Sequence, residues 1–363
     1  MMDSNTGGIG RYTSELVSNI LHEDKTNKYF LIHSNTCTYN FKGNYTEIYL
    51  PFFSTIPRKL LIGALFFERI CAKYNLDILH DLGQISPFYF PSNTKRILTV
   101  FDMTPLLFPN NISYLSKVYS KLYPRILKNT DKIITISKHS KQDITKILNI
   151  DPKHISVTLL GSTPSIKKNT DTTSLLRVAK KYSLPAKFML FVGTIEPRKN
   201  LPSLIRAFAQ SLPSIPKDLT LVIAGGMGWE DKSIYHLPKS LGIEGKIIFI
   251  GEIANEDLAS IYSLASIFVY PSIYEGFGLP PIEAMACGCP VITSNTGSLP
   301  EIVGNAAVTL DPYKLDKSLA TNINKILMDR SFTRTLIANG LKRAKIYSWK
   351  TTAKQTIALY ENI

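Results

Sequence analysis

The sequence predicts an α/β fold with two parallel-sheet domains, and three observations support this. The chain has 363 residues, which is long enough for two domains that each bury a core. Apolar, β-rich runs alternate with segments of helical period in both halves, a pattern typical of βαβ units with parallel sheets. Turn-forming and polar residues interrupt the alternation over residues 161–186, where we place the interdomain linker.

Residues 1–165 are expected to form an N-terminal Rossmann-like domain. Its predicted strands are residues 29–33, 47–50, 77–80, 96–101, 132–136 and 156–160, and its predicted helices are residues 9–21, 58–74, 114–128 and 138–148. These segments have the lengths that βαβ units require.

Residues 166–345 are expected to form a second Rossmann-like domain. Its predicted strands are residues 188–192, 219–224, 246–250, 267–270, 290–293 and 307–310, and its predicted helices are residues 201–210, 256–264, 280–286, 315–328, 332–347 and, closing the chain, 349–362. Two such sheets that face each other would bind a ligand in a cleft at the carboxyl ends of their strands.

Composition limits the possible partners and the compartment. The net charge of +14 suits a phosphorylated substrate or an anionic membrane surface, but no block of Lys and Arg indicates nucleic-acid binding. The longest apolar stretch, residues 60–67, is too short to cross a bilayer, and the N-terminus does not resemble a signal peptide. Because Cys287 and Cys289 cannot complete a tetrahedral site, we expect small buried residues there, no bound metal and a cytoplasmic location.

Two short motifs have the composition of phosphate-binding segments. Residues 6–12 (TGGIGRY) lead into a predicted helix, where Gly8 would let the backbone approach an anion at the helix N-terminus. Residues 193–200 (GTIEPRKN) directly follow a predicted strand, so Arg198 and Lys199 would lie at its carboxyl end. Cations are disfavoured at the start of the helix that follows, so a bound diphosphate would explain why Arg198 and Lys199 lie there.

The strongest signal is residues 271–285 (PSIYEGFGLPPIEAM). A strand ends at Tyr270, a Gly-rich loop follows, and Pro280 and Pro281 open a helix, where proline is tolerated. The N–H groups of residues 277–279 can point at a phosphate oxygen. Two carboxylates flank this turn: Glu283 could reach the vicinal hydroxyls of a ribose, and Glu275 could contact a sugar.

These residues carry a resemblance to a known family. Glu275 and Glu283 match the Glu-x7-Glu signature of retaining GT-B glycosyltransferases, and the surrounding sequence resembles glycosyltransferase family 4, the mannosyltransferase-like group 1 glycosyltransferases. Residues 7–12, 193–200, 249–253 and 347–349 are also similar to that family, so the resemblance covers nearly the whole chain in order.

The resemblance implies a GT-B fold and a role for each motif. The donor site would consist of Gly8, Arg198, Lys199, Ile253, Phe277, Gly278, Leu279 and Glu283, with Glu275 and Asp102 as catalytic residues. Cations and amides would hold the diphosphate without a metal or other cofactor, Glu283 would bind the ribose, and Ile253 would lie in the loop that frames the base. Transfer would retain the anomeric configuration, and residues 346–363 would form a helix that crosses back to the N-terminal domain.

The sequence departs from the family pattern at two places. The family usually opens with a hydrophobic strand ahead of the Gly-Gly loop, whereas only six residues precede Gly7 here, so we expect the first strand to be missing through a truncated gene model. Many relatives carry His-Asp where this chain has Phe101-Asp102, and Phe101 cannot exchange a proton. Asp102 could orient the acceptor or act as a weak base, but it could equally cap a turn.

The sequence therefore predicts a retaining hexosyltransferase, acting on a glycan or lipid-linked acceptor in surface polysaccharide or lipopolysaccharide assembly. Lys117, Lys121, Arg125 and Lys128 fall on one face of a predicted helix and could contact anionic lipid, although a solvated face explains them as well. One alternative is a catalytically impaired, binding-only homologue. A nucleotide-dependent oxidoreductase is less favoured, because no Gly-x-Gly-x-x-Gly follows the first strand.

Overall fold

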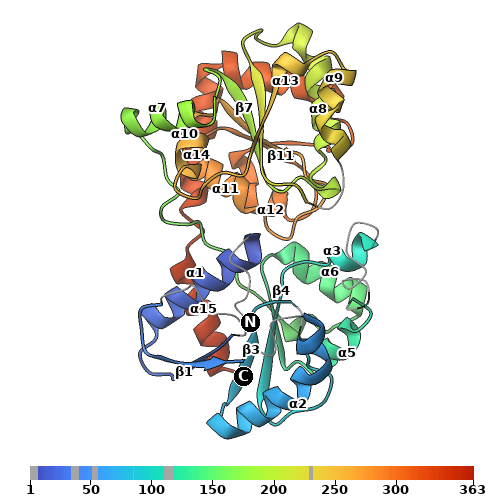
Figure 1. Ribbon diagram of the computed structural model, residues 1–363, viewed down its shortest axis with the longest axis vertical. Helices are drawn as coiled ribbons and strands as arrows, with labels where there is room; N and C mark the ends of the chain where they lie inside the picture. The colour runs from blue at the N-terminus through green and yellow to red at the C-terminus, as the bar shows by residue number, and fades with distance from the viewer. Residues whose placement is uncertain are drawn as a thin grey trace. The chain divides into compact units, whose positions relative to one another are not determined.

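The computed structural model describes residues 7–33, 41–50, 56–84, 86–109, 118, 120–228 and 232–363. The chain divides into two compact units (Figure 1). The N-terminal unit comprises Met1–Gly161 and Ser348–Ile363, and the C-terminal unit is Ser162–Tyr347. Both units are α/β structures with parallel sheets, so the predicted fold class is confirmed.

The C-terminal unit is built on a six-stranded sheet in the order β12-β11-β10-β7-β8-β9, with every described pair parallel. The strands are β7 (Phe188–Val192), β8 (Thr220–Ala224), β9 (Ile247–Gly251), β10 (Ile267–Tyr270), β11 (Val291–Ser294) and β12 (Val308–Leu310). The order reverses between β7 and β10, which lie side by side although about seventy-five residues of sequence separate them. The segments after these two strands therefore meet at one edge of the sheet.

Helices surround this sheet, whose central strands are apolar and buried on both faces. They are α7 (Thr172–Lys181), α8 (Leu201–Ser211), α9 (Leu237–Ser240), α10 (Leu258–Leu264), α11 (Leu279–Ala286), α12 (Leu299–Val303), α13 (Leu315–Met328) and α14 (Arg330–Ala344). Phe191 of β7 and Phe268 of β10 both stack on Tyr270, which places an aromatic layer beneath the edge where the two strands end.

Helix α7 lies in the segment that composition alone predicts to be a linker. The Asp171 side chain accepts hydrogen bonds from the amides of Thr173 and Ser174 and caps the helix. Val178 is its buried residue, and Arg177 and Lys181 form ion pairs of 2.7 and 2.6 Å with the buried Asp257, so both kinds of contact hold the helix against the unit. The linker prediction is wrong for residues 172–181 because one buried position gives too weak a periodic signal.

The N-terminal unit contains two parallel sheets, β1-β2 and β3-β4-β5-β6. Its strands are β1 (Tyr29–His33), β2 (Tyr45–Tyr49), β3 (Ile78–Asp81), β4 (Lys95–Val100), β5 (Lys132–Thr135) and β6 (Ile155–Val157). Its helices include α1 (Gly7–Glu23), α2 (Ile56–Tyr74), α3 (Thr104–Leu107), α5 (Tyr123–Lys128), α6 (Lys138–Leu148) and α15 (Trp349–Glu361). The predicted helix over residues 114–128 is described only in part, because residues 110–117 and 119 lie outside the described ranges.

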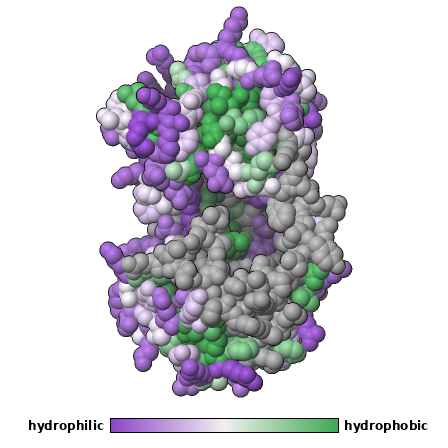
Figure 2. All heavy atoms as spheres, in the orientation of Figure 1, coloured by the Kyte–Doolittle hydropathy of each residue, from purple (hydrophilic) through white to green (hydrophobic). Residues whose placement is uncertain are grey.

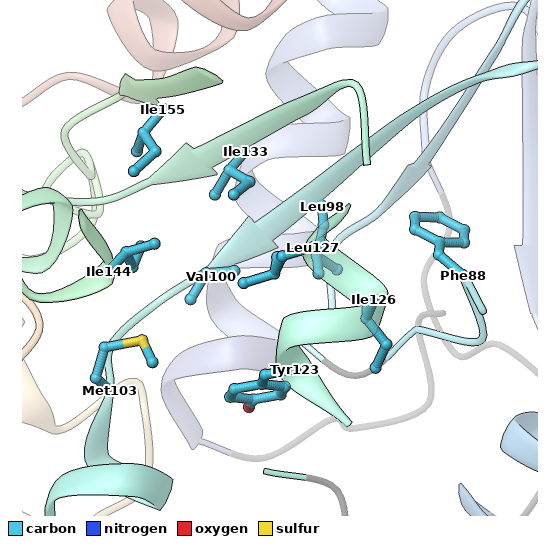
Figure 3. Close-up of a cluster of buried hydrophobic side chains, with 10 residues drawn as sticks. All are labelled: Phe88, Leu98, Val100, Met103, Tyr123, Ile126, Leu127, Ile133, Ile144 and Ile155. Carbon is cyan, nitrogen blue, oxygen red and sulfur yellow. The ribbon is translucent and has the colours of Figure 1, made fainter. Parts of the chain in front are cut away.

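The main core of the N-terminal unit lies between strands β4 to β6 and helices α5 and α6. Figure 3 shows its buried side chains converging from these elements. They are Phe88, Leu98, Val100, Met103, Tyr123, Ile126, Leu127, Ile133, Ile144 and Ile155. Their aliphatic and aromatic packing holds β4 rigidly, and β4 carries Phe101 and Asp102 at its carboxyl end.

The chain returns to the N-terminal unit after Tyr347, where α15 packs along α1. Lys350 and Lys354 form ion pairs of 3.3 and 3.5 Å with the carboxylate of Glu23. The Trp349 ring lies 6.1 Å from the ring of Tyr12. None of the helices in the described ranges combines the length and the hydropathy needed to span a bilayer.

Gly161 is required where the first crossing between the units meets α15. A Cβ at this position would lie 2.2 Å from the backbone nitrogen of Trp349, a contact that only backbone movement can relieve. We predict that Gly161→Ala lowers the free energy of unfolding by about 1–3 kcal/mol, measured by urea denaturation. Gly245→Ala is the matched control, since no atom lies within 4 Å of its added Cβ, and we expect no more than about 0.5 kcal/mol of change. Equal effects of the two substitutions would contradict the prediction.

Candidate functional site

The functional groups of the C-terminal unit gather where β7 and β10 end. After β7, residues 193–200 form a turn and a short 3-10 helix, Pro197–Lys199, that leads into α8. After β10, residues 271–278 lead into α11. The amide of Ile273 donates to the carbonyl of Arg198 at 2.9 Å, so the two segments are hydrogen-bonded to each other. Neighbouring strands thus bring together two motifs that are far apart in sequence.

An ion cluster joins these two segments. The Glu275 carboxylate binds Arg198 Nη1 at 2.8 Å through Oε2 and Lys199 Nζ at 2.6 Å through Oε1. Arg198 Nη2 also donates to Glu196 Oε1 at 2.5 Å, and Lys199 Nζ donates to the Tyr270 hydroxyl at 2.6 Å. The structure therefore brings together the three charged residues that the sequence nominates on these two segments.

Burial and charge oppose each other at Glu275. Removal from water raises the pKa of this carboxyl, but the Arg198 and Lys199 cations outweigh that effect and hold the pKa at about 2. Burial lowers the pKa of Lys199, and the Glu275 carboxylate counteracts the change. Glu275 is consequently ionised near neutral pH, and its charge is fixed in place by two cations.

The turn before α11 depends on glycine at two positions. Gly278 adopts a φ of 100°, and a Cβ there would lie 2.5 Å from Leu299 Cδ2. Gly297 adopts a φ of 62°, and a Cβ there would lie 2.9 Å from the amide nitrogen of Glu275. These glycines let the loop that carries Glu275 and Phe277 pack tightly against the segment after β11, which places the amides of residues 277–279 at the start of α11.

Three residues that the sequence analysis did not identify support the site. The Ser298 hydroxyl lies 2.9 Å from both the Glu275 and the Phe277 carbonyl oxygens and ties the loop to the segment after β11. Tyr270 accepts from Lys199, as described above. Tyr262 donates to Glu283 Oε2 at 3.1 Å. Ser298 follows a glycine at the end of a neighbouring strand, a signal that could have identified it, whereas neither tyrosine belongs to a recognisable motif.

Glu283 lies one turn into α11 and is nearly inaccessible, with 2% of its surface exposed. Its carboxylate is held by the Tyr262 hydroxyl of α10. Ile253 is half-buried in the loop that follows β9, the strand beside β8 at the end of the sheet order. Phe277 is buried, and its ring meets the Tyr347 ring edge-on at 5.4 Å.

Gly8 and Asp102 belong to the N-terminal unit. Gly8 is exposed in the first turn of α1, with no atom within 4 Å of an added Cβ. Asp102 follows β4, where its Oδ1 accepts from the Thr104 amide at 2.9 Å and so braces the start of α3. Phe101 is buried edge-on against Tyr12, at a ring distance of 4.9 Å. Asp102 therefore has the turn-bracing contact that the sequence left as an alternative.

The described residues also give the positions of possible metal ligands, of three cysteines and of most of the predicted basic helix face. Among the described residues, no group of three or more His, Cys, Asp or Glu could hold a metal ion. Cys71, Cys287 and Cys289 are free thiols and buried, and Cys37 lies outside the described ranges. Of the predicted basic face, Lys121, Arg125 and Lys128 are exposed, while Lys117 lies outside the described residues.

Comparison with known proteins defines the class to which this fold and site belong. The whole chain resembles sucrose-phosphate synthase from Thermosynechococcus elongatus, with a TM-score of 0.77 at 24% identity over 99% of this chain and 94% of that one. It also resembles Anabaena HepE in complex with UDP and glucose, with a TM-score of 0.77 at 17% identity over 99% and 97% of the two chains. The fold is thus the GT-B fold of glycosyltransferases.

Sequence comparison then defines the family. The profile described as Glycosyl transferases group 1 matches residues 176–343. The O-antigen chain mannosyltransferase B of Escherichia coli is 36% identical over 282 residues, which is 76% of this chain and 72% of that protein. This chain belongs to the group 1 glycosyltransferases, and the family resemblance derived from its motifs is confirmed. Because the chain belongs to this family, we reject the oxidoreductase alternative.

The Glu275 ion cluster predicts acid sensitivity of the C-terminal unit. Because the pKa of Glu275 is lower in the folded than in the unfolded chain, its stabilisation is present above pH 4.5 and is lost as pH falls toward 2. We predict that the free energy of unfolding falls by a few kcal/mol over this window, on the order of 3 from the size of the shift. Urea denaturation at stepped pH values measures it.

Glu275→Gln has no carboxyl to protonate in this window. Its free energy of unfolding should therefore be lower than that of the parent chain at pH 6 and should depend less on pH. The exposed Glu256 provides the matched control, and Glu256→Gln should keep the acid sensitivity of the parent chain. If Glu275→Gln and the parent chain gave parallel pH profiles, the assignment of the acid response to Glu275 would be wrong.

Proposed function

We propose that this protein transfers a hexosyl unit, and specifically a mannosyl unit, from a nucleoside diphosphate sugar to a glycan or lipid-linked acceptor in surface polysaccharide assembly. The observation that carries the proposal is the cluster of Arg198, Lys199 and Glu275 beside the N-terminus of α11. A guanidinium fork, an ammonium and helix-terminal amides meet at the carboxyl edge of a parallel sheet, where this class of fold binds nucleotides.

We assign different tasks to the two cations because their exposure differs. The Arg198 side chain is 16% exposed, whereas that of Lys199 is 8% exposed and lies between Tyr270 and Glu275. Arg198 would therefore reach a phosphate oxygen directly. Lys199 would mainly hold Glu275 in place and add positive potential behind the diphosphate. Together with the amides of residues 277–279, they would stabilise the charge that develops on the departing nucleoside diphosphate.

Glu275 and Glu283 would bind the sugar and the ribose of the donor. Glu275 has the properties of a positioned hydrogen-bond acceptor for sugar hydroxyls, since it is ionised, buried and held from two sides. Glu283, braced by Tyr262, would accept hydrogen bonds from the ribose hydroxyls once a ligand displaces the residues that cover it. Ile253 would pack beside the base, and Gly8 would approach the diphosphate from the N-terminal unit.

We propose a metal-independent, retaining reaction. Fixed cations and amides would neutralise the leaving group, which removes the need for a metal ion. The acceptor hydroxyl would attack on the face from which the nucleotide leaves, and a phosphate oxygen of the nucleotide would accept its proton. Phe101 cannot act as an acid or a base, so Asp102 would orient the acceptor.

The choice of mannose and of polysaccharide assembly rests on the relatives. The Escherichia coli relative is an O-antigen chain mannosyltransferase. Anabaena HepE, which has a similar fold, was solved in complex with UDP and glucose. The exposed Lys121, Arg125 and Lys128 of the N-terminal unit would let the protein rest on anionic lipid, where a lipid-linked acceptor would be found. Binding to anionic vesicles that falls with added salt would support this location.

Calorimetric titration with GDP, UDP and ADP tests the donor site. We predict that one diphosphate binds selectively and that Arg198→Ala weakens it by about 10–100-fold, because a charge-assisted hydrogen bond to phosphate is lost. Arg206→Ala is the control, since Arg206 is an exposed arginine on α8. No binding of any of the three by the folded protein would refute the donor site.

Turnover separates the enzyme from a binding-only homologue. We expect the protein to release nucleoside diphosphate from a mannosyl donor with an acceptor present, to be unaffected by EDTA, and to give a product whose anomeric configuration, read by NMR, equals that of the donor. Selective nucleotide binding without turnover would favour the binding-only alternative. An inverted product would contradict the proposed stereochemistry.

A further inference from the structure

Helix α7 is anchored to the C-terminal unit by a buried carboxylate. Arg177 Nη2 and Lys181 Nζ lie 2.7 and 2.6 Å from the two carboxylate oxygens of Asp257, whose side chain is 0% exposed. Figure 2 shows mainly hydrophilic atoms at the left edge of this unit, where α7 lies in Figure 1. A helix with a polar outer surface is therefore held at a single charged point beneath it.

Hydrogen bonds also join the segment before α7 to α10. The backbone amide of Asn169 donates to Ser263 Oγ at 2.9 Å, and its side-chain amide donates to Ser260 Oγ at 2.8 Å. Both serines belong to α10, and Asp257 is the N-cap residue of that helix. The segment is thus tied to α10 at both of its ends. Because buried hydrogen bonds are directional, they specify one position of α7 on this helix.

The residue that follows α7 connects this helix to the loop after β9. The Tyr182 hydroxyl accepts from the Ala254 amide at 3.1 Å and donates to Asp257 Oδ2 at 3.1 Å. The Asp257 amide donates to the Ala254 carbonyl at 2.9 Å, which closes residues 254–257 into a turn. One hydroxyl group therefore holds both ends of this turn, and it comes from a different part of the chain.

These contacts fix the backbone on either side of Ile253. Ile253 and Ala254 share a planar trans peptide, so the hydrogen bond to the Ala254 N–H also sets the direction of the Ile253 carbonyl. On the other side, Gly251 ends β9 with a φ of 69°, and its carbonyl accepts from the Gly225 amide at 2.7 Å. The loop is therefore held by the sheet at Gly251 and by Tyr182 at Ala254, with Ile253 between these two points.

The backbones that follow β7, β8 and β9 lie against one another at the same edge of the sheet. A Cβ at Gly225 would lie 2.0 Å from the carbonyl oxygen of Gly193, so the segment after β8 touches the segment that leads to Arg198. A Cβ at Gly226 would lie 2.3 Å from Glu252 Oε1, so it also touches the loop after β9. A ligand held at Arg198 can therefore extend to this loop within the C-terminal unit.

We propose that Tyr182 is a positioning residue that sets which nucleoside diphosphate this protein prefers, through the loop that carries Ile253. The inference rests on the proposed function, in which Ile253 packs beside the base. Contacts to the diphosphate at Arg198 and α11 are the same for every nucleotide, so a preference must come from the surroundings of the base. A loop held at both ends presents one surface to the base, whereas a mobile loop adapts to several. Asp257 contributes by anchoring α7, which carries Tyr182 at its end.

Removal of the Tyr182 hydroxyl tests this role by calorimetric titration with GDP, UDP, ADP and inorganic pyrophosphate. We expect Tyr182→Phe to reduce the ratio of Kd between the second-best and the best nucleoside diphosphate by about 3–10-fold, the size of one lost hydrogen bond. Pyrophosphate has no base, so its Kd should change by less than about 2-fold. The matched control is Tyr49→Phe, which removes the hydroxyl of an exposed tyrosine of β2 in the N-terminal unit and should change neither value.

A second measurement follows the loop without any ligand. Amide exchange resolved by NMR should be at least about 10-fold faster at Ala254 in Tyr182→Phe than in the parent chain, while exchange in β8 stays the same. Should Tyr182→Phe fail to fold, Arg177→Gln decides, because it removes one of the two cations of Asp257 and leaves the hydroxyl in place. We then expect the same two changes at about 2–3-fold.

The possible results separate this inference from the proposed donor site. A selective parent chain whose preference and Ala254 exchange are unchanged in Tyr182→Phe would overturn the inference and leave the donor site intact. Equal losses of affinity for nucleotides and for pyrophosphate would also overturn it, because Tyr182 would then support the whole site. A parent chain that binds all three diphosphates equally has no preference for Tyr182 to set. If it binds none of them, the donor site is refuted and the inference with it.

Discussion

The interaction on which the candidate site of the C-terminal unit depends is the double ion pair of Glu275 with Arg198 and Lys199. It links the loop after β10 to the 3-10 helix after β7, and it fixes three charges within one buried cluster. A buried carboxylate is tolerated only because two cations and the neighbouring hydroxyl network offset its desolvation. Glu275 and Glu196 in turn hold the two cations in position.

The sheet order makes this ion cluster possible. The chain reverses direction across the sheet between β7 and β10, so the two strands lie side by side and their following loops share one edge. Gly278 and Gly297 permit the close approach of the loop to α12 and to the segment after β11. The buried parallel sheet thus holds the two loops that carry the candidate site in a fixed relation to each other.

The two units differ in how their described strands are arranged. The C-terminal unit has one continuous six-stranded sheet, whereas the N-terminal unit has two shorter sheets that share a helix layer. A cavity between β1 and β3 adjoins α1, whose first turn carries Gly8, and α15, which returns after Tyr347.

The sequence by itself determined the α/β class, most strand positions, the family and the charged residues of the two motifs. Each of these signals is local, because hydrophobic period, turn residues and short motifs are written in neighbouring residues. Only the tertiary structure decided that Tyr262, Tyr270 and Ser298 support Glu283, Lys199 and Glu275, and that α7 occupies a polar segment. Those facts depend on strand order and packing between distant segments, which local patterns do not encode.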